Sequence, residues 1–169
     1  MSGDGNVGQQ FDRLPETPAD QEIEGRASRE QVVNFWYDRY GVPKSVFDDF
    51  TLWEKGAGKI WIFGGDVAAP ISIEGLGMKL MRTRQEHWKP TTNGAQRFGR
   101  HATKNVIVLD TEQAEQFAHG TDIDYPDWDG DWGYLIAAHE LAGVTEPIGV
   151  GLYLHGELRS VVPKGRQFD

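Results

Sequence analysis

Ten of the seventeen lysines and arginines in the chain lie in two short segments, residues 79–104 and 159–166. The stretch between them, residues 105–158, carries eleven aspartates and glutamates and neither lysine nor arginine. Cationic side chains that gather on one face can neutralise phosphates even though the net charge is −9. We therefore expect the two segments to form one phosphate-binding surface. Its predicted cations are Lys79, Arg82, Arg84, Lys89, Arg97, Arg100, Lys104, Arg159, Lys164 and Arg166.

Aromatic side chains are interleaved with the cations of the first segment, and Trp88 and Phe98 are large enough to stack on bases. The preferred interpretation places both in a hydrophobic core, and the cations do not need them to be exposed. His101 follows Arg100 directly and completes the predicted binding residues of this segment.

Two glycines later in the chain, Gly149 and Gly151, alternate with Val150 and Leu152 and leave one strand face without side chains. Glycine weakens a strand, so such a face indicates that something approaches closely. Either a packed helix or an RNA backbone fits this description. On the second interpretation, both glycines belong to the RNA-binding residues.

Two short motifs resemble catalytic signatures but lack essential members. Gly56 to Lys59 begins like a phosphate loop, yet Ile60 follows where serine or threonine is needed, which favours a turn. His139 is followed by glutamate as in zinc proteases, but Gly143 stands where the second histidine belongs. We therefore predict no catalytic residues.

The loop with Asp127, Asp129 and Asp131 resembles the first half of a calcium-binding loop. Trp132 and Ala138 stand where its glycine and final carboxylate are required. A solvated acidic loop is the preferred interpretation, and a small metal-dependent enzyme remains an alternative. We predict no metal site, no cofactor and no enzymatic activity.

The composition narrows the cellular setting. The chain has no cysteine, which excludes disulfides and a thiol nucleophile and fits a reducing compartment. No segment approaches the roughly 20 apolar residues of a membrane span, and no secretory signal is visible. We expect a cytoplasmic protein without a membrane partner. Abundant carboxylates with few lysines further suggest a halophilic, archaeal host.

Local patterns predict an α+β fold that begins with a disordered acidic tail, residues 1–25. Ser28 and Gln31 form a capping box for a helix that ends at Gly41. Residues 52–54 and 60–63 read as a β-hairpin, and residues 78–84 read as a further strand.

The second half has a different order of elements. Lys89-Pro90 interrupts the chain before a short helix that reaches residue 100 and a strand at 106–109. A helix at 112–118 follows, with Asp110 or Thr111 as its predicted cap. Three strands follow, within residues 134–162, and His155-Gly156 forms the last tight turn. We therefore predict an α+β domain over residues 26–86 and a mostly β domain over residues 87–169.

Residues 147–166, Pro-Ile-Gly-Val-Gly-Leu-Tyr-Leu-His-Gly-Glu-Leu-Arg-Ser-Val-Val-Pro-Lys-Gly-Arg, resemble the C-terminal end of a PUA domain. They are most similar to the PUA-like module of Sun-family rRNA (cytosine-5) methyltransferases. The element order is also similar to ribosome-biogenesis factors with a pre-PUA domain before a PUA domain. The resemblance covers roughly residues 28–168. It implies a small pre-PUA-like α+β unit followed by a PUA-like β pseudo-barrel.

Two departures limit what the resemblance implies. The chain is too short for a methyltransferase domain and lacks the cysteine nucleophile, and Arg166 directly follows Gly165 in the closing motif. We expect a non-catalytic protein that binds structured rRNA or tRNA in ribosome biogenesis or RNA modification. Its expected partners are RNA and a ribosomal particle or an RNA-modifying enzyme. The alternative is an adaptor that delivers RNA to a separate enzyme.

Overall fold

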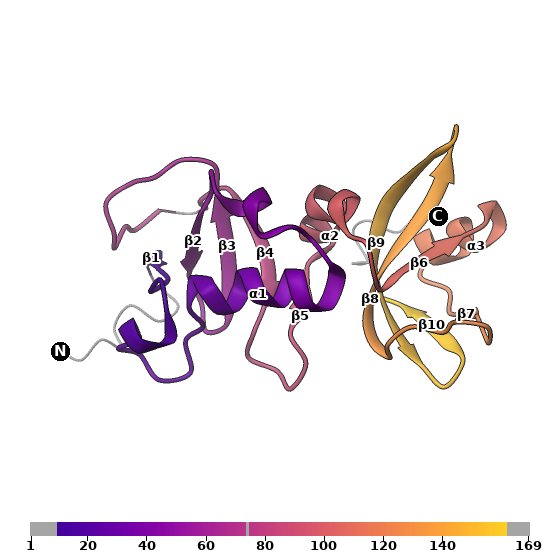
Figure 1. The fold of residues 1–169 in the computed structure, drawn as a ribbon, viewed down its shortest axis with the longest axis horizontal. Helices are drawn as coiled ribbons and strands as arrows, with labels where there is room; N and C mark the ends of the chain where they lie inside the picture. The colour runs from indigo at the N-terminus through magenta and orange to yellow at the C-terminus, as the bar shows by residue number, and fades with distance from the viewer. Residues whose placement is uncertain (1–9, 74, 162–169) are drawn as a thin grey trace. The chain divides into compact units, whose positions relative to one another are not determined.

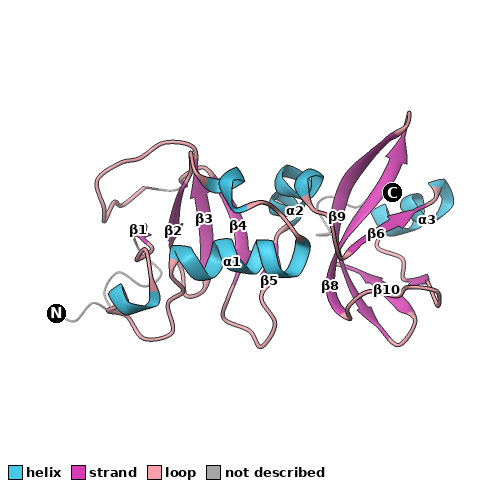
Figure 2. Ribbon diagram, viewed as in Figure 1, coloured by secondary structure: helices cyan, strands magenta, loops and turns pink. Residues whose placement is uncertain are grey.

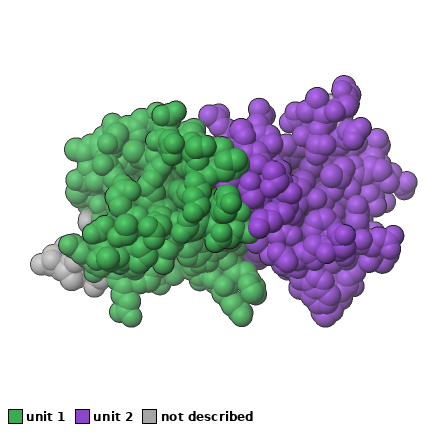
Figure 3. All heavy atoms as spheres, viewed as in Figure 1, with its two compact units in different colours: residues 1–38, 43–89 green, residues 39–42, 90–169 purple. Residues whose placement is uncertain are grey.

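The computed structural model describes residues 10–73 and 75–161. The chain divides into two compact units (Figure 3). Unit 1 comprises residues 1–38 and 43–89, and unit 2 comprises residues 39–42 and 90–169. Helices and two sheets occur together, which confirms the α+β class (Figure 2).

Unit 1 contains a five-stranded sheet in the order β1-β2-β3-β4-β5. Its strands are β1 (Asp12–Arg13), β2 (Thr51–Glu54), β3 (Lys59–Phe63), β4 (Met78–Arg82) and β5 (Lys89–Pro90). Strands β2 and β3 pair antiparallel with Trp53 opposite Trp61, which confirms the predicted hairpin. Gly56 and Gly58, both with positive φ, form the turn between them.

Helix α1 (Arg29–Tyr40) runs in front of β2, β3 and β4 in Figure 1. The predicted capping box is present, because Gln31 N donates to Ser28 Oγ at 3.1 Å and Ser28 N donates to Gln31 Oε1 at 2.9 Å. Trp36 is fully buried and packs on Phe47 of η3 (Lys44–Phe47), a short 3₁₀ helix.

The expectation of a disordered tail is wrong for residues 10–25. Phe11 is fully buried with Trp53 and Leu76, and its backbone exchanges two hydrogen bonds with Ile71. Arg26 is buried and donates to Glu54 at 2.7 Å and to Asp12 at 2.8 Å. These apolar contacts and hydrogen bonds offset the entropy of ordering a mostly polar segment. A 3₁₀ turn, η2 (Pro18–Asp20), follows β1; residues 1–9 lie outside the described residues.

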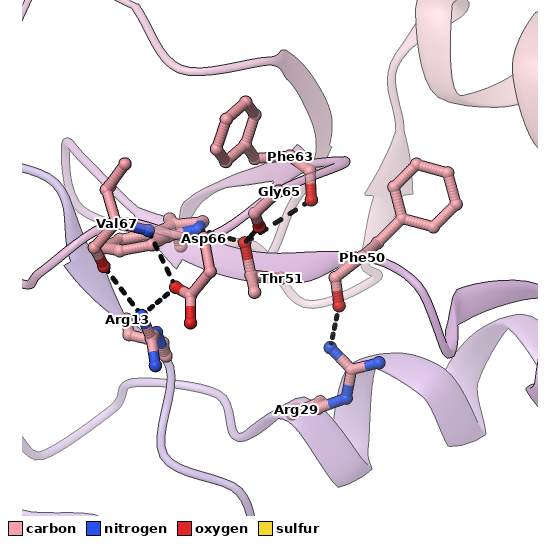
Figure 4. A network of polar contacts seen from close by, with 9 residues as sticks. Arg13, Arg29, Phe50, Thr51, Phe63, Gly65, Asp66 and Val67 are labelled. Atoms are coloured by element: carbon pink, nitrogen blue, oxygen red, sulfur yellow. Dashed lines mark hydrogen bonds and ion pairs between the residues drawn. The ribbon is translucent and has the colours of Figure 1, made fainter.

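Polar contacts fasten the long connection between β3 and β4 to the sheet (Figure 4). The Arg13 guanidinium pairs with the Asp66 carboxylate and donates to the Val67 carbonyl oxygen at 2.7 Å. Thr51 Oγ1 donates to the Gly65 carbonyl oxygen at 2.7 Å. The chain therefore enters β4 from an anchored loop.

Unit 2 contains a curled sheet in the order β6-β8-β9-β10-β7, in which only β6 and β8 pair in parallel. The long strands β8 and β9 bend along their length (Figure 2). Its strands are β6 (Val106–Leu109), β7 (Ile123–Asp124), β8 (Gly133–Leu141), β9 (Val144–Leu154) and β10 (Glu157–Ser160). Its helical elements are α2 (Thr92–Phe98), η4 (Gly99–His101) and α3 (Thr111–Ala118).

The core of unit 2 contains side chains from a helix and from the strands. Phe117 of α3 and Leu158 of β10 are both fully buried in it. Asp110 caps α3 through a reciprocal pair of hydrogen bonds with Gln113, which confirms one of the two predicted caps. Strands β8 and β9 extend through a turn at Ala142-Gly143, both with positive φ. This turn and the strand extensions around it were not predicted from the sequence.

No helix among the described residues is long and apolar enough to cross a membrane.

Candidate nucleic-acid interface

Strand pairing gathers basic residues on one part of the unit 1 sheet. Lys59 lies directly opposite Arg82, and Trp61 lies opposite Lys79. Leu80 is the extra residue of a β-bulge between these two pairs. Because the bulge shifts the alternation of side chains, Lys79 and Arg82 fall on the same face although three positions separate them.

The pKa shifts show that these cations are close enough to repel each other. Burial is the main cause that lowers the pKa of the Lys79 ammonium, and the charges of Arg82 and Lys59 lower it further. Burial, and then the Arg82 charge, lower the pKa of Lys89 on β5. Arg82 therefore acts on both lysines. We call Lys59, Lys79, Arg82 and Lys89 the sheet cluster.

Arg84 extends the basic surface beyond the end of β4. Thr83 N donates to the Gly58 carbonyl oxygen at 2.8 Å, so the end of β4 packs on the β2–β3 turn. A Cβ at Gly58 would lie 2.6 Å from Arg84 Cβ, which only a glycine avoids. Arg84 itself is exposed.

A second group of cations projects from the short helices of unit 2. Thr91 caps α2 by accepting a hydrogen bond from Gly94 N at 2.9 Å. The end of α2 is pressed against β8 and β9, because a Cβ at Gly99 would lie 3.0 Å from Pro147 Cβ. Gln96 Nε2 also donates to the Ile148 carbonyl oxygen at 3.0 Å. The exposed residues of this region, the helix cluster, are Arg97, Arg100, His101 and Lys104.

The two aromatic residues interleaved with these cations pack inside the protein. Phe98 is only 2% exposed, so it belongs to the core and does not present a stacking face. Trp88 is half-buried, with its ring 5.5 Å from that of Phe35.

The glycines of β9 lie inside unit 2, which favours the packing interpretation for Gly151, and RNA binding by Gly149 and Gly151 stays a prediction. Both are buried. A Cβ at Gly151 would lie 2.5 Å from Leu158 Cδ1 and 3.2 Å from Phe117 Cε2. The missing side chain at Gly151 therefore makes room for the core of unit 2.

Of the cations in the second predicted basic segment, Arg159 alone lies within the described residues. Arg159 is exposed on β10, where its Nε lies 3.2 Å from Glu157 Oε1. Lys164 and Arg166 lie outside the described residues. One joint surface of both segments stays a prediction.

The chain is similar to known proteins in two comparisons. Residues 1–77 match the model of a family of unknown function, DUF7122. Over 109 residues, 63% of this chain, the sequence is 27% identical to the ribosomal RNA small subunit methyltransferase F of Aeromonas salmonicida (strain A449). The chain resembles an rRNA methyltransferase. The matched part spans 22% of that protein's length, so the likeness to this methyltransferase is distant and partial.

The likeness to the methyltransferase agrees with part of the expected Sun-family resemblance. The family match covers residues of unit 1 and carries no functional description. The PUA assignment stays a prediction.

Asp131 of the acidic loop and His139 of the zinc-protease-like motif make structural contacts. Asp131 Oδ2 accepts a hydrogen bond from Asn105 Nδ2 at 2.9 Å and lies 3.5 Å from Arg39 Nη1. His139 Nδ1 lies 3.1 Å from the Leu109 carbonyl oxygen. Among the described residues, no three His, Asp or Glu side chains are grouped closely enough to hold a metal ion.

Sequence reasoning missed Lys59, because the motif containing it was interpreted only as a turn. The turn is confirmed, but the same turn places Lys59 at the start of β3 and opposite Arg82. Pairing the predicted hairpin with the strand at residue 78 would have revealed this position.

Proposed function

We propose that this chain is a non-catalytic RNA-binding protein that recognises structured rRNA or tRNA in ribosome biogenesis or RNA modification. The observation that carries the proposal is the helix cluster, where Arg97 and Arg100 are exposed on short, well-anchored helices and Lys104 is exposed just after them. Guanidinium groups bind phosphates through paired hydrogen bonds, and their anchoring lowers the entropy lost on binding.

The charge distribution supports the same proposal. Residues 105–158 carry no lysine or arginine, whereas residues 77–104 carry seven with a single glutamate. Acidic surfaces repel RNA, so they restrict its contacts to the basic surface and disfavour non-specific binding.

The proposed role of unit 2 is that of a PUA-like module. The pattern of residues 147–166, the curled sheet of β6 to β10 and the distant likeness to an rRNA methyltransferase support this assignment. Binding is the proposed activity, and a ribosomal particle or a separate modifying enzyme is the proposed partner. A cytoplasmic location in a salt-loving, archaeal host belongs to the same proposal.

The test compares Arg100→Gln with Lys44→Gln, a control that removes one exposed charge from η3, outside both clusters. Binding of a fluorescently labelled RNA hairpin is measured by anisotropy between about 0.1 and 1 M salt, where screening shortens from about 10 to about 3 Å. Arg100→Gln should lower the slope of log K against log salt by about 0.7 to 0.9. An unchanged slope in Arg100→Gln, or an equal loss in Lys44→Gln, would contradict the proposal.

A further inference from the structure

The sheet cluster of unit 1 contradicts the usual rule for strand pairs. Residues directly opposite each other in an antiparallel pair have Cβ atoms about 5 Å apart, and like charges there are destabilising. Lys59 and Arg82 are such a pair, and each is within the charge field that lowers the pKa of Lys79. Departures from local rules are expected at functional sites.

The carboxylate of Glu54, on the neighbouring strand β2, is engaged by other groups. Glu54 of β2 lies opposite Ile60, is buried, and accepts hydrogen bonds from Arg26 Nε at 2.7 Å and Gly58 N at 2.9 Å. Glu54 is therefore already engaged by the Arg26 guanidinium and by the backbone of the β2–β3 turn. Glu86, in the segment between β4 and β5, is exposed.

The spacing of the cations identifies the kind of anion. The four side chains come from three neighbouring strands, β3, β4 and β5. Neighbouring strands lie about 4.8 Å apart, so the cations extend over about 10 Å. A row of that length suits the repeated phosphates of a nucleic-acid backbone better than one small anion.

An aromatic ring borders the row. The Lys79 ammonium lies 5.3 Å from the centre of the Trp61 ring, and Phe11 contacts the same ring edge-on at 5.0 Å. Trp61 is half-buried, so its ring supports the Lys79 side chain from below. This packing reduces the freedom that Lys79 would lose on binding a phosphate.

We infer that unit 1 has its own RNA-backbone site, in which Lys59, Lys79, Arg82 and Lys89 bind consecutive phosphodiester groups. The inference rests on the proposed function only in taking RNA as the ligand. It adds Lys59, which lies within the family match of residues 1–77, to the binding residues.

The test uses the full chain and three variants: Lys59→Gln/Arg82→Gln, Arg97→Gln/Arg100→Gln, and Lys44→Gln as the control. Anisotropy of the labelled RNA hairpin is measured over the same salt range. Lys59→Gln/Arg82→Gln should lower the salt slope by about 1.4 to 1.8, twice the loss for one phosphate contact. Because the double substitution removes a like-charge pair, its thermal midpoint should equal or exceed that of the wild type, which verifies folding.

The outcomes distinguish the sheet site from the proposed function. If only Arg97→Gln/Arg100→Gln lowers the slope, the sheet site is wrong and the proposed function stands. If only Lys59→Gln/Arg82→Gln lowers it, the sheet site stands and the helix cluster is not the binding surface. Absence of RNA binding by the wild type overturns both. Displacement of RNA from the sheet cluster by an equal charge concentration of polyglutamate would also overturn the inference, because a protein ligand would then fit as well.

Discussion

The two basic clusters hold like charges close together in different ways. In the helix cluster the cations are all exposed on α2, η4 and the residue stretch after them, where water screens their repulsion. In the sheet cluster Lys59, Lys79 and Lys89 are half-buried and cross-strand pairing fixes their positions. A helix therefore presents cations at little cost in stability, whereas a sheet holds them in a fixed row and loses stability by doing so.

The largest expected effect is a loss of stability in unit 1 that does not involve the charges of the sheet cluster. Phe11→Ala should destabilise unit 1 by about 3 to 5 kcal/mol, because Phe11 is fully buried against Trp53 and Leu76. The free energy of unfolding is measured by urea denaturation. A loss below about 1 kcal/mol would mean that residues 10–25 contribute little, as expected for a disordered tail.

A second substitution tests whether β9 serves packing or RNA. Gly151→Ala should cost about 1 to 3 kcal/mol, because the new Cβ would collide with Leu158 and crowd Phe117. Gly64→Ala is the control, since its Cβ would meet only Phe50 at an ordinary 3.8 Å. The RNA affinity of the folded Gly151→Ala protein should equal that of the wild type. Weaker RNA binding with unchanged stability would restore the idea of an RNA-facing glycine.

Local signals in the sequence predicted much of this fold. The Ser28–Gln31 and Asp110 caps and the β2–β3 hairpin depend on residues within a few positions of each other, so a single sequence reveals them. The burial of Phe11 depends on Leu76, 65 positions away, and no local pattern reports such a contact. The position of Lys59 likewise depends on a distant residue, because its partner Arg82 lies on a strand beyond a long loop.

The pH dependence of binding should distinguish the clusters. Lowered pKa values mean that Lys79 and Lys89 lose their protons below the usual value of 10.5. RNA affinity through the sheet cluster should therefore fall as pH rises toward 10.5, while guanidinium groups stay charged. Arg97→Gln/Arg100→Gln, which leaves the sheet cluster, should show the steeper fall in anisotropy titrations. A steeper fall in Lys59→Gln/Arg82→Gln would reverse the assignment.

The same shifts affect stability in a defined direction. The folded pKa values of Lys79 and Lys89 are lowered, so below them both ammonium groups are charged and the folding cost is fully present. The cost is relieved as pH rises through the folded values toward 10.5. Their contribution should therefore make unit 1 more stable with rising pH in that window. In Lys79→Gln this part of the increase should be smaller in denaturation experiments, and an unchanged increase would contradict the account.

The smallest expected effect concerns the cross-strand pair itself. Lys59→Gln should raise the free energy of unfolding by a few tenths of a kcal/mol, because like charges opposite each other are destabilising by about 0.2 to 1 kcal/mol. Lys104→Gln, which removes an exposed charge outside the sheet, should leave it unchanged. Urea denaturation at low salt is the measurement. A loss of stability in Lys59→Gln would show that Lys59 has a structural role.

Crosslinking is the most direct test of RNA binding through the basic clusters. The full chain is irradiated with rRNA, and the crosslinked peptides are identified by mass spectrometry. Peptides from residues 59–89 and 91–104 should carry the RNA, because these ranges contain the sheet and helix clusters. Crosslinks confined to the acidic residues 105–158, or none above those of a protein that does not bind RNA, would contradict the account.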